Sequence, residues 1–285
     1  MKIAVLSGKG GTGKTLVSVN LAAIASQSLY VDCDVEEPNG HLFLKPKNIT
    51  SMDISVKIPL VNDQLCNGCK KCVEFCKFNA LAYTGDKLMI FEDICHSCGG
   101  CAILCPEKAL KEKDKIIGSI EKGVSDNVSV YTGILKPGQV TGVPIIEKLL
   151  DLIETEENIT IIDCPPGSAC VVMESIKDAD YCILVAEPSV FGVHNLSMVY
   201  ELVNLFNKPF GVVLNKCLDE ENPAEKFCLD NNMKILGKID FDKDLGLINS
   251  RALIAVKERK KYYNLFLKLF EAILKEVRDE TVVNS

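Results

Sequence analysis

The sequence predicts an α/β fold with a mostly parallel sheet, into which a small α+β module rich in cysteine is inserted. Short apolar runs alternate with helical patterns along most of the 285 residues, and this alternation is typical of a parallel sheet covered on both faces. A glycine loop directly follows the first run, and eight of the fourteen cysteines lie between about residues 58 and 115. We therefore predict one domain made of residues 1–57 and 116–285, interrupted by a module at 58–115.

The elements of the larger domain follow from their local patterns. Apolar runs of strand length, rich in β-branched residues, predict strands at 2–7, 29–33, 159–164, 182–186 and 210–214. Apolar residues at helical spacing predict helices at 13–26, 143–154, 194–206 and 223–231.

A last helix is predicted at 258–278, with one apolar face. Glu271 and Glu276 on this helix weaken the case for binding to an anionic membrane surface. We therefore expect it to pack on the sheet, and we expect no membrane partner.

Composition and charge narrow the class of protein. The net charge is −7, which argues against broad binding of nucleic acid. No apolar stretch reaches the ~18 residues that span a bilayer, and the chain runs straight into its first strand without a signal peptide. We expect a cytoplasmic protein, where fourteen cysteines point to metal binding rather than to disulfides.

The glycine loop matches the phosphate-binding pattern G-x-x-x-x-G-K-[ST] between a strand and a helix. In this loop, backbone N–H groups and the helix N-terminus bind phosphate oxygens. Lys14 is expected to neutralise the β and γ phosphates, and Thr15 to place its hydroxyl on Mg²⁺. The fold is thus predicted to be that of a P-loop NTPase, with the loop formed by Gly8, Lys9, Gly10, Gly11, Thr12, Gly13, Lys14 and Thr15.

Carboxylates end two of the predicted strands beside this loop, where they are well placed for Mg²⁺ and water. Asp32 and Asp34 close the second strand, and Asp32 is expected to support Mg²⁺ or the loop. Asp163 ends a further apolar strand and is followed by Pro-Pro-Gly, a pattern typical of Walker B and the second switch. We predict that Asp163 binds Mg²⁺ through water and that Gly167 senses the γ-phosphate.

The cysteine module contains an internal duplication in which each half carries C-x-x-C-x-x-C-x-x-x-C. This is the spacing of bacterial two-cluster ferredoxins, in which the fourth cysteine of each half binds the other cluster. One 4Fe–4S cluster is therefore expected on Cys66, Cys69, Cys72 and Cys105, and the second on Cys95, Cys98, Cys101 and Cys76. Zinc is an alternative for C-x-x-C pairs, but it does not need the repeated third and fourth cysteines. Lys77 departs from the usual proline after the first quartet.

These motifs together resemble the MinD/Mrp/nitrogenase-iron-protein class of P-loop ATPases, carrying an inserted ferredoxin domain. The resemblance rests on Lys9 in a deviant Walker A loop, on the D-x-D and D-x-P-P-G motifs, and on Asn215-Lys216 after a strand. It implies an ATP-dependent homodimer in which Lys9 contacts the partner's nucleotide. It also implies that Asp34 activates the attacking water and that Asn215 binds adenine, with the opposite wall expected at 239–244.

The six cysteines outside the module are expected to be small core residues, except Cys170, which follows the second switch near the expected dimer interface. In the nitrogenase iron protein, which belongs to the class that this chain resembles, a cysteine in this neighbourhood holds a cluster that bridges two subunits. This chain lacks the rest of that ligand set, so Cys170 stays an open candidate.

Three functions remain open: an ATP-gated electron carrier, an iron–sulfur carrier or assembly factor, and a positioning or regulatory ATPase. We favour the first, with an unidentified redox or iron–sulfur client. Against the second, the chain has no C-x-x-C in its C-terminal half. A dehydrogenase is disfavoured because the chain has no G-x-G-x-x-G fingerprint.

Overall fold

The computed structural model describes residues 1–25, 27–153, 159–218 and 222–283. Ser26 and Glu154, the predicted ends of two helices, lie outside this part of the chain. The strands are β1 (Lys2–Leu6), β2 (Ser28–Asp32), β3 (Lys47–Val61), β4 (Leu81–Thr84), β5 (Lys87–Ile90), β6 (Leu110–Ser125), β7 (Val128–Leu135), β8 (Ile159–Asp163), β9 (Tyr181–Ala186), β10 (Phe210–Cys217) and β11 (Ile235–Asp240). The helices are α1 (Lys14–Ile24), α2 (Gly40–Leu44), α3 (Lys71–Phe75), α4 (Gly100–Ile103), α5 (Val143–Asp151), α6 (Cys170–Ile176), α7 (Val190–Leu205), α8 (Pro223–Asp230), α9 (Lys243–Ser250), α10 (Ala255–Glu258) and α11 (Lys260–Val283).

The large sheet is mostly parallel, as the sequence predicts. Within the described residues its strand order is β11-β10-β9-β1-β8-β2-β7-β6-β3. Every pair from β11 to β7 is parallel, whereas β6 and β3 join antiparallel. The carboxyl ends of the neighbours β1, β8 and β2 therefore meet at one edge, which brings the glycine loop and the predicted acids together.

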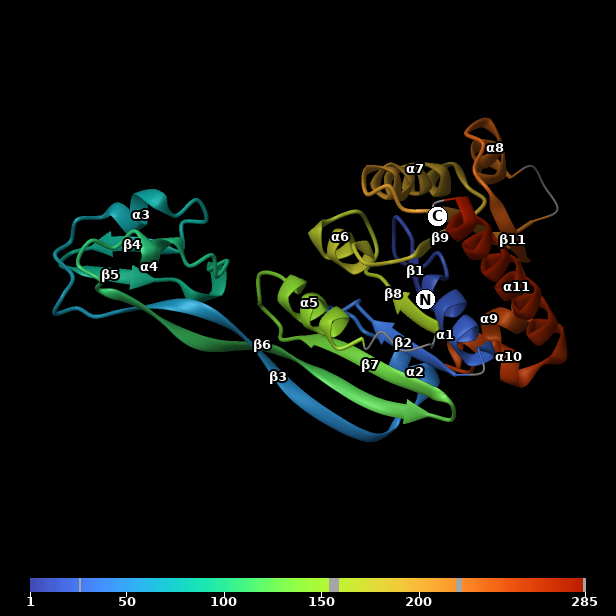
Figure 1. The fold of residues 1–285 in the computed structure, drawn as a ribbon, viewed down its shortest axis with the longest axis horizontal. Coiled ribbons are helices and arrows are strands. Elements are labelled where there is room, and N and C mark those ends of the chain that lie inside the picture. The colour runs from blue at the N-terminus through green and yellow to red at the C-terminus, as the bar shows by residue number, and fades with distance from the viewer. Residues whose placement is uncertain (26, 154–158, 219–221, 284–285) are drawn as a thin grey trace.

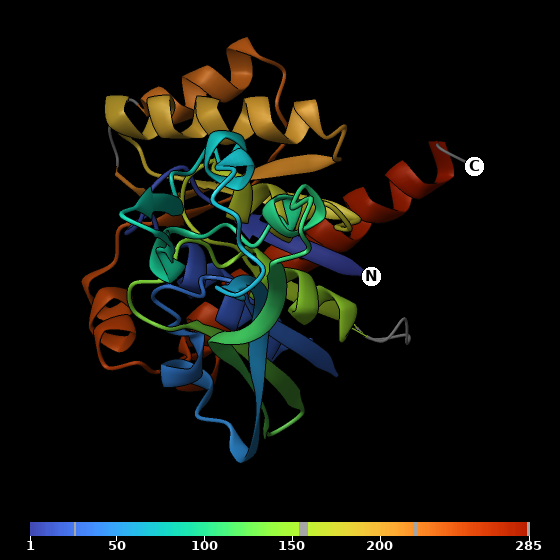
Figure 2. The ribbon, with the colours of Figure 1, turned by 90° about the vertical axis from the view of Figure 1, so that its left-hand side faces the viewer.

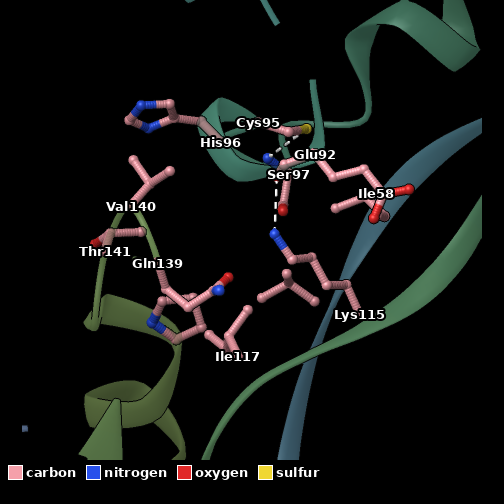
Figure 3. Close-up of a pocket in the computed structure, with 12 residues that line it drawn as sticks. Ile58, Glu92, Cys95, His96, Ser97, Lys115, Ile117, Gln139, Val140 and Thr141 are labelled. Atoms are coloured by element: carbon pink, nitrogen blue, oxygen red, sulfur yellow. Dashed lines mark hydrogen bonds between the residues drawn. The ribbon is translucent and has the colours of Figure 1, made fainter. Parts of the chain in front are cut away.

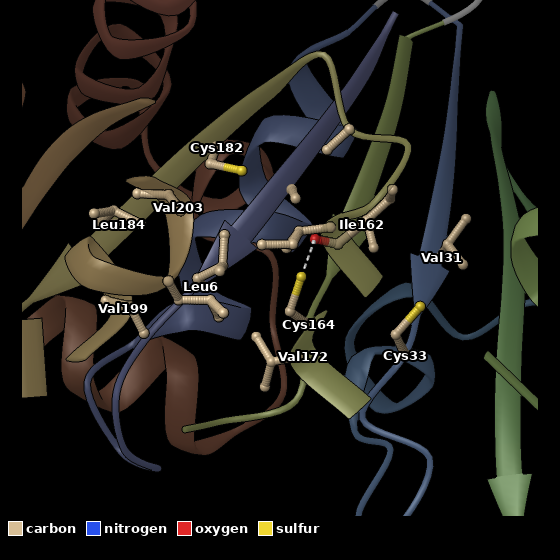
Figure 4. Packing of buried hydrophobic residues seen from close by; sticks show 14 of the residues in the cluster. Leu6, Val31, Cys33, Ile162, Cys164, Val172, Cys182, Leu184, Val199 and Val203 are labelled. Atoms are coloured by element: carbon tan, nitrogen blue, oxygen red, sulfur yellow. Dashed lines mark hydrogen bonds between the residues drawn. The ribbon is translucent and has the colours of Figure 1, made fainter. Parts of the chain in front are cut away.

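Helices cover both faces of this sheet (Figure 1). Along β1, Ala4 and Leu6 face the core under α5, α6, α7 and α8, while Ile3 and Val5 face the core under α1, α9, α10 and α11. This alternation follows from the two-residue period of a strand. Five cysteines belong to the first core, as predicted: Cys33, Cys164, Cys182, Cys217 and Cys228. Figure 4 labels the first three of them.

Helix α11 packs on the domain, as expected from its apolar face. Tyr262, Phe266 and Ile273 are buried in the same core as α1 and β11. In the described part of the chain, no helix has the length and apolar character needed to cross a membrane.

A long antiparallel ribbon of β3 and β6 carries the cysteine module away from the rest of the domain (Figure 1). In Figure 2 the module faces the viewer. The ribbon pairs Lys47 with Val124 at one end and Val61 with Leu110 at the other. The sequence analysis did not predict these strands, because they carry many charged residues and much of their length is exposed. Residues 58 and 115, predicted as module boundaries, lie inside β3 and β6.

The module repeats its backbone conformation in its two halves. Helices α3 and α4 occupy corresponding places after the first cysteines of each half. Left-handed residues recur at matching positions, in the pairs Gly68 and Ser97, Lys70 and Gly99, and Asn79 and Lys108. The segments Ala80-Leu81 and Ala109-Leu110, which end the halves, are all buried. The duplication in sequence is therefore also a duplication in structure.

Candidate functional site: a phosphate loop and two thiol cavities

The glycine loop joins β1 to α1 and has a backbone that suits anion binding. Gly13, at the N-cap of α1, has φ 97°, which an L-residue with a side chain adopts only with strain. A Cβ at this position would also lie 2.1 Å from the Asn215 Nδ2 atom. Glycine is therefore required here for two independent reasons.

Lys14 lies at the centre of the acidic group predicted from sequence. Its Nζ donates to Asp163 Oδ1 at 2.6 Å and lies 4.0 Å from Asp34 Oδ2. Tyr30 Oη and Ser18 Oγ also donate to Asp163, at 2.8 and 3.1 Å. Burial disfavours the ammonium, but the Asp163, Asp32 and Asp34 charges outweigh it and raise the pKa of Lys14. Lys14 is therefore a fixed cation at the base of the site.

Asp32 is fully buried, and backbone groups occupy both of its oxygens. Oδ1 accepts from the Asp34 N–H, and Oδ2 accepts from the N–H groups of Asn39 and Gly40 at 3.2 and 2.9 Å. Burial, together with the Asp163 charge, raises the pKa of Asp32 to about 7. Of the two predicted roles, this geometry favours support of the loop at 34–40.

Asp34 stands closer to solvent and faces the glycine loop. Burial raises the pKa of its carboxyl to about 6, against the opposing charge of Lys14. The side chain retains 17% of its exposure, and Asp34 lines a cavity of about 370 Å³ in front of the loop. Asp34 therefore has access to anything bound there.

The sequence analysis did not assign several residues that line this cavity, among them Asn39, Phe43 and Asn249. Asn249 Oδ1 is buried and has no hydrogen-bond partner in the described part of the chain, so it offers an unused acceptor. Nothing in the sequence singles out an asparagine near the end of α9. Residues 239–244, expected as a wall of the adenine pocket, do not line this cavity, and their contact with adenine remains a prediction.

Asn215 and Lys216 hold the glycine loop from below. Asn215 Nδ2 donates to Thr12 O, and Lys216 Nζ donates to Gly11 O, each at 2.7 Å. Asn215 is only 2% exposed, and its strand β10 continues to Cys217, past the predicted end. Its proposed contact with adenine remains a prediction, whereas its support of the loop is visible.

Lys9 folds back onto its own chain. Its ammonium pairs with Glu187, which follows β9, and lies 5.3 Å from the ring centre of Phe191. Glu187 also lies 3.6 Å from Lys216 Nζ. The Phe191 side chain remains 64% exposed. Lys9 must leave Glu187 if it is to reach a second subunit.

The second switch follows β8. The Gly167 N–H donates to Ser7 O at 2.9 Å, and Gly167 has φ 97°. Thr15 lines the loop cavity at the start of α1. Gly167 and Thr15, which were predicted to contact the nucleotide, thus lie at the same edge of the sheet as Lys14.

The eight module cysteines line two separate cavities. Cys66, Cys69, Cys72 and Cys105 line one, which we call the first thiol cavity. Cys76, Cys95, Cys98 and Cys101 line the other, the second thiol cavity. The fourth cysteine of each half has crossed to the cavity of the other half, which is the exchange that the spacing predicts.

Backbone amides point at the sulfurs in both halves. The Ala80 N–H donates to Cys76 Sγ at 3.4 Å, and the Ala109 N–H donates to Cys105 Sγ at 3.3 Å. Such N–H···S bonds stabilise thiolates on iron–sulfur clusters and tune their potentials. Burial raises the pKa of Cys101 to about 11, so this thiol is neutral at pH 7 unless a metal binds it. The donor set of four thiols and directed amides fits a 4Fe–4S cluster in each cavity.

In the described residues, no three side chains of His, Cys, Asp or Glu gather closely enough to hold a single metal ion. This holds for the thiol cavities and for Asp32, Asp34 and Asp163.

The comparison with protein families agrees with this geometry. Residues 3–254 match the model of the CobQ/CobB/MinD/ParA nucleotide binding domain. The chain belongs to this family. It is therefore a nucleotide-binding protein with the α/β fold of P-loop NTPases.

Relatives of this family member include an uncharacterised protein of Methanocaldococcus jannaschii, 29% identical over 278 residues and 96% of each chain. An iron-sulfur cluster carrier protein of the same organism is 24% identical over 296 residues, which span 97% of this chain and 84% of the relative. The cell division ATPase MinD of Pyrococcus furiosus has a similar structure, with a TM-score of 0.60, 20% identity and coverage of 96% and 98%. This last likeness shows the fold alone.

Proposed function

We propose that this protein is an ATP-hydrolysing homodimer. Nucleotide-dependent changes of the dimer are coupled to electron transfer through two 4Fe–4S clusters in the inserted module. The observation that carries the proposal is the sorting of eight cysteines into two cavities of four, with the fourth cysteine of each half exchanged. Two clusters in one small module suit electron flow, since each, when bound, takes up and releases an electron.

At the proposed nucleotide site, each residue has a separate role. The loop amides and Lys14 bind the phosphates, while Thr15 and Asp163 are proposed to hold Mg²⁺, Asp163 through water. Asp34, which faces the cavity with a raised pKa, is proposed to orient and deprotonate the attacking water. Gly167 is proposed to sense the γ-phosphate.

The homodimer is proposed from Lys9 and its surroundings. Beside Lys9, Val190 and Phe191 at the start of α7 are 79% and 64% exposed. A second subunit would cover this apolar surface. Lys9 would then leave Glu187 and contact the phosphates of the partner's nucleotide, which carry more negative charge than one carboxylate.

The test is to purify the chain without oxygen, count iron and sulfide, and measure Mg-ATP hydrolysis with the clusters oxidised and then reduced. We expect about eight irons per chain and a hydrolysis rate that changes with redox state. Cys69→Ser and Cys98→Ser each remove one cluster, and Cys170→Ser, likewise exposed but outside the module, is the matched control. An unchanged rate with all irons retained contradicts the coupling.

A second candidate is a carrier of iron–sulfur clusters. It is favoured by the relative named as such a carrier and by Cys69 and Cys98, which are exposed and so within reach of an acceptor. Incubation with an apo-ferredoxin distinguishes the two functions. A carrier loses its iron to the acceptor at a rate that depends on ATP, whereas an electron carrier keeps it.

A further inference from the structure

A small cavity of about 30 Å³ lies between the cysteine module and the α/β domain (Figure 3). The module lines it with Glu92 and the segment Cys95, His96 and Ser97, and the domain lines it with Gln139, Val140, Thr141 and Pro144. In Figure 3, His96 lies above the loop that carries Val140 and Thr141. Here the two parts of the chain face each other directly, beside the ribbon.

On the domain side, the loop between β7 and α5 is tied to the residue that follows Asp34. The Leu135 N–H donates to Val35 O at 2.8 Å. Gly142 packs so tightly on Val35 that a Cβ there would lie 2.2 Å from Val35 Cγ2. Val35 is 2% exposed. A shift of Asp34 on nucleotide binding therefore has to move the ends of this loop, because a close-packed interior transmits displacement.

On the module side, Cys95 belongs to both cavities. It lines the cavity between the parts and also the second thiol cavity. Lys115 of β6 fixes the approach to it, donating to Glu92 O and to Asp93 Oδ1, each at 3.0 Å. None of the cysteines of the first thiol cavity lines the cavity between the parts. The contact between the parts is thus specific to one set of thiols.

The ribbon has an irregularity where it leaves the domain. Ile54 pairs with Gly118 and Ser55 with Ile116, so Ile117 is the extra residue of a β-bulge. Ile54 and Ile117 are both buried in the domain core. A bulge bends a ribbon locally, and Ile117 of this bulge also lines the small cavity between the parts.

We propose that loop 139–142 transmits the nucleotide state from Asp34 to the second thiol cavity and not to the first. The proposal rests on the function proposed above, because it assumes bound ATP and assembled clusters. It adds that one cluster responds to nucleotide and that the ribbon bends at the Ile117 bulge. The cluster on Cys66, Cys69, Cys72 and Cys105 then works at constant potential.

Linkage makes this proposal quantitative. If ATP binds the oxidised and reduced forms with affinities that differ tenfold, the midpoint potential of the responding cluster shifts by about 59 mV for one electron. The same coupling must appear in both directions, since allosteric coupling is reciprocal for binding free energies. Reduction of the second cluster therefore changes ATP affinity by the same factor.

The experiment titrates each cluster alone, by EPR, with and without ATP and Mg²⁺. Cys69→Ser leaves the second cavity's cluster, and Cys98→Ser leaves the first. We expect ATP to shift the midpoint potential in the Cys69→Ser protein and not in the Cys98→Ser protein. Equal shifts, or a shift confined to the Cys98→Ser protein, would overturn the proposal.

A second variant tests the loop. Val140→Ala, at a residue 40% exposed, trims the loop where it faces the module, and Val124→Ala, 47% exposed on the ribbon, is the matched control. We expect Val140→Ala to reduce the shift at least twofold while ATP hydrolysis stays unchanged, and Val124→Ala to preserve the shift. A full shift in the Val140→Ala protein refutes the role of the loop.

Hydrogen exchange on the unsubstituted chain needs no single-cluster variant. ATP is expected to change exchange at 136–142 and 92–97 and to leave 66–72 unchanged. Unchanged exchange at 136–142 overturns the proposal even if hydrolysis and iron content are normal. Missing iron or missing hydrolysis instead contradicts the proposed function, so the two failures are distinguishable.

Discussion

Replacing Lys14 with methionine removes the cation that pairs with Asp163 while preserving most of the apolar stem. In the unsubstituted protein, the Lys14 side chain is 7% exposed and the Asp163 side chain 1%. Asp32, fully buried beside them, also interacts with the Lys14 charge. Breaking a buried ion pair from one side costs about 3–5 kcal/mol, because an uncompensated charge remains. We expect the free energy of unfolding to fall by that amount at pH 8.

The loss should depend on pH in a direction that follows from the carboxyl groups. The pKa of Asp32 is raised to about 7 and that of Asp34 to about 6, although Lys14 lowers both. Without Lys14 these pKa values rise further, so the folded variant binds protons more tightly than the unfolded chain, whose Asp pKa is about 3.9. Stability then falls as pH rises through the folded pKa values. The loss should be smaller at pH 5.5, where these carboxyls are largely protonated.

The assay is urea unfolding of anaerobic protein, followed by circular dichroism at pH 5.5 and pH 8 in EDTA. Lys9→Met is the control, because Lys9 is 33% exposed and a surface pair contributes about 0.2–1 kcal/mol. A loss below about 1 kcal/mol at pH 8, or an equal loss at both pH values, would refute the reasoning. Iron should remain bound, since the thiol cavities lie in the module.

Further predictions concern the other site residues. Asp34→Asn should lower ATP hydrolysis by about 10²–10⁴-fold with ATP still bound, and in the unsubstituted protein hydrolysis should fall as the pH drops below about 6, where Asp34 protonates; nucleotide binding by calorimetry and a rate–pH profile check both. Lys9→Ala should abolish the ATP-dependent rise in mass seen by light scattering, and normal dimers would contradict the cross-subunit contact. Gly13→Ala should weaken ATP binding at least tenfold, because its Cβ meets Asn215, whereas Gly246→Ala, with no atom within 4 Å, should leave binding unchanged. Cys69→Ser should halve the iron content, and loss of all iron would contradict two independent clusters.

Local patterns predicted β1, β2, β8, β9 and β10, because each is an apolar run of strand length, but they missed the parallel strands β7 and β11. Strands β1, β2 and β8 differ from the prediction by a residue at most at each end. The ribbon of β3 and β6 was missed for a physical reason. Its strands are stabilised by pairing with each other, and much of their surface is exposed, so they show neither a buried run nor a clean alternation.

The sequence alone determined which chemistry the chain offers. A phosphate loop needs its glycines and its lysine at fixed spacing. Cysteine spacing alone predicted which four thiols share a cavity, because the fourth cysteine of each half lies too far along the chain to reach the first three. Only the tertiary structure decided how these groups are held. It assigned the oxygens of Asp32 to backbone amides, brought Asn249 to the cavity, paired Lys9 with Glu187 and set Cys95 against loop 139–142. Each of these contacts joins residues from separate elements, and the packing of those elements, rather than any local pattern, sets their distance.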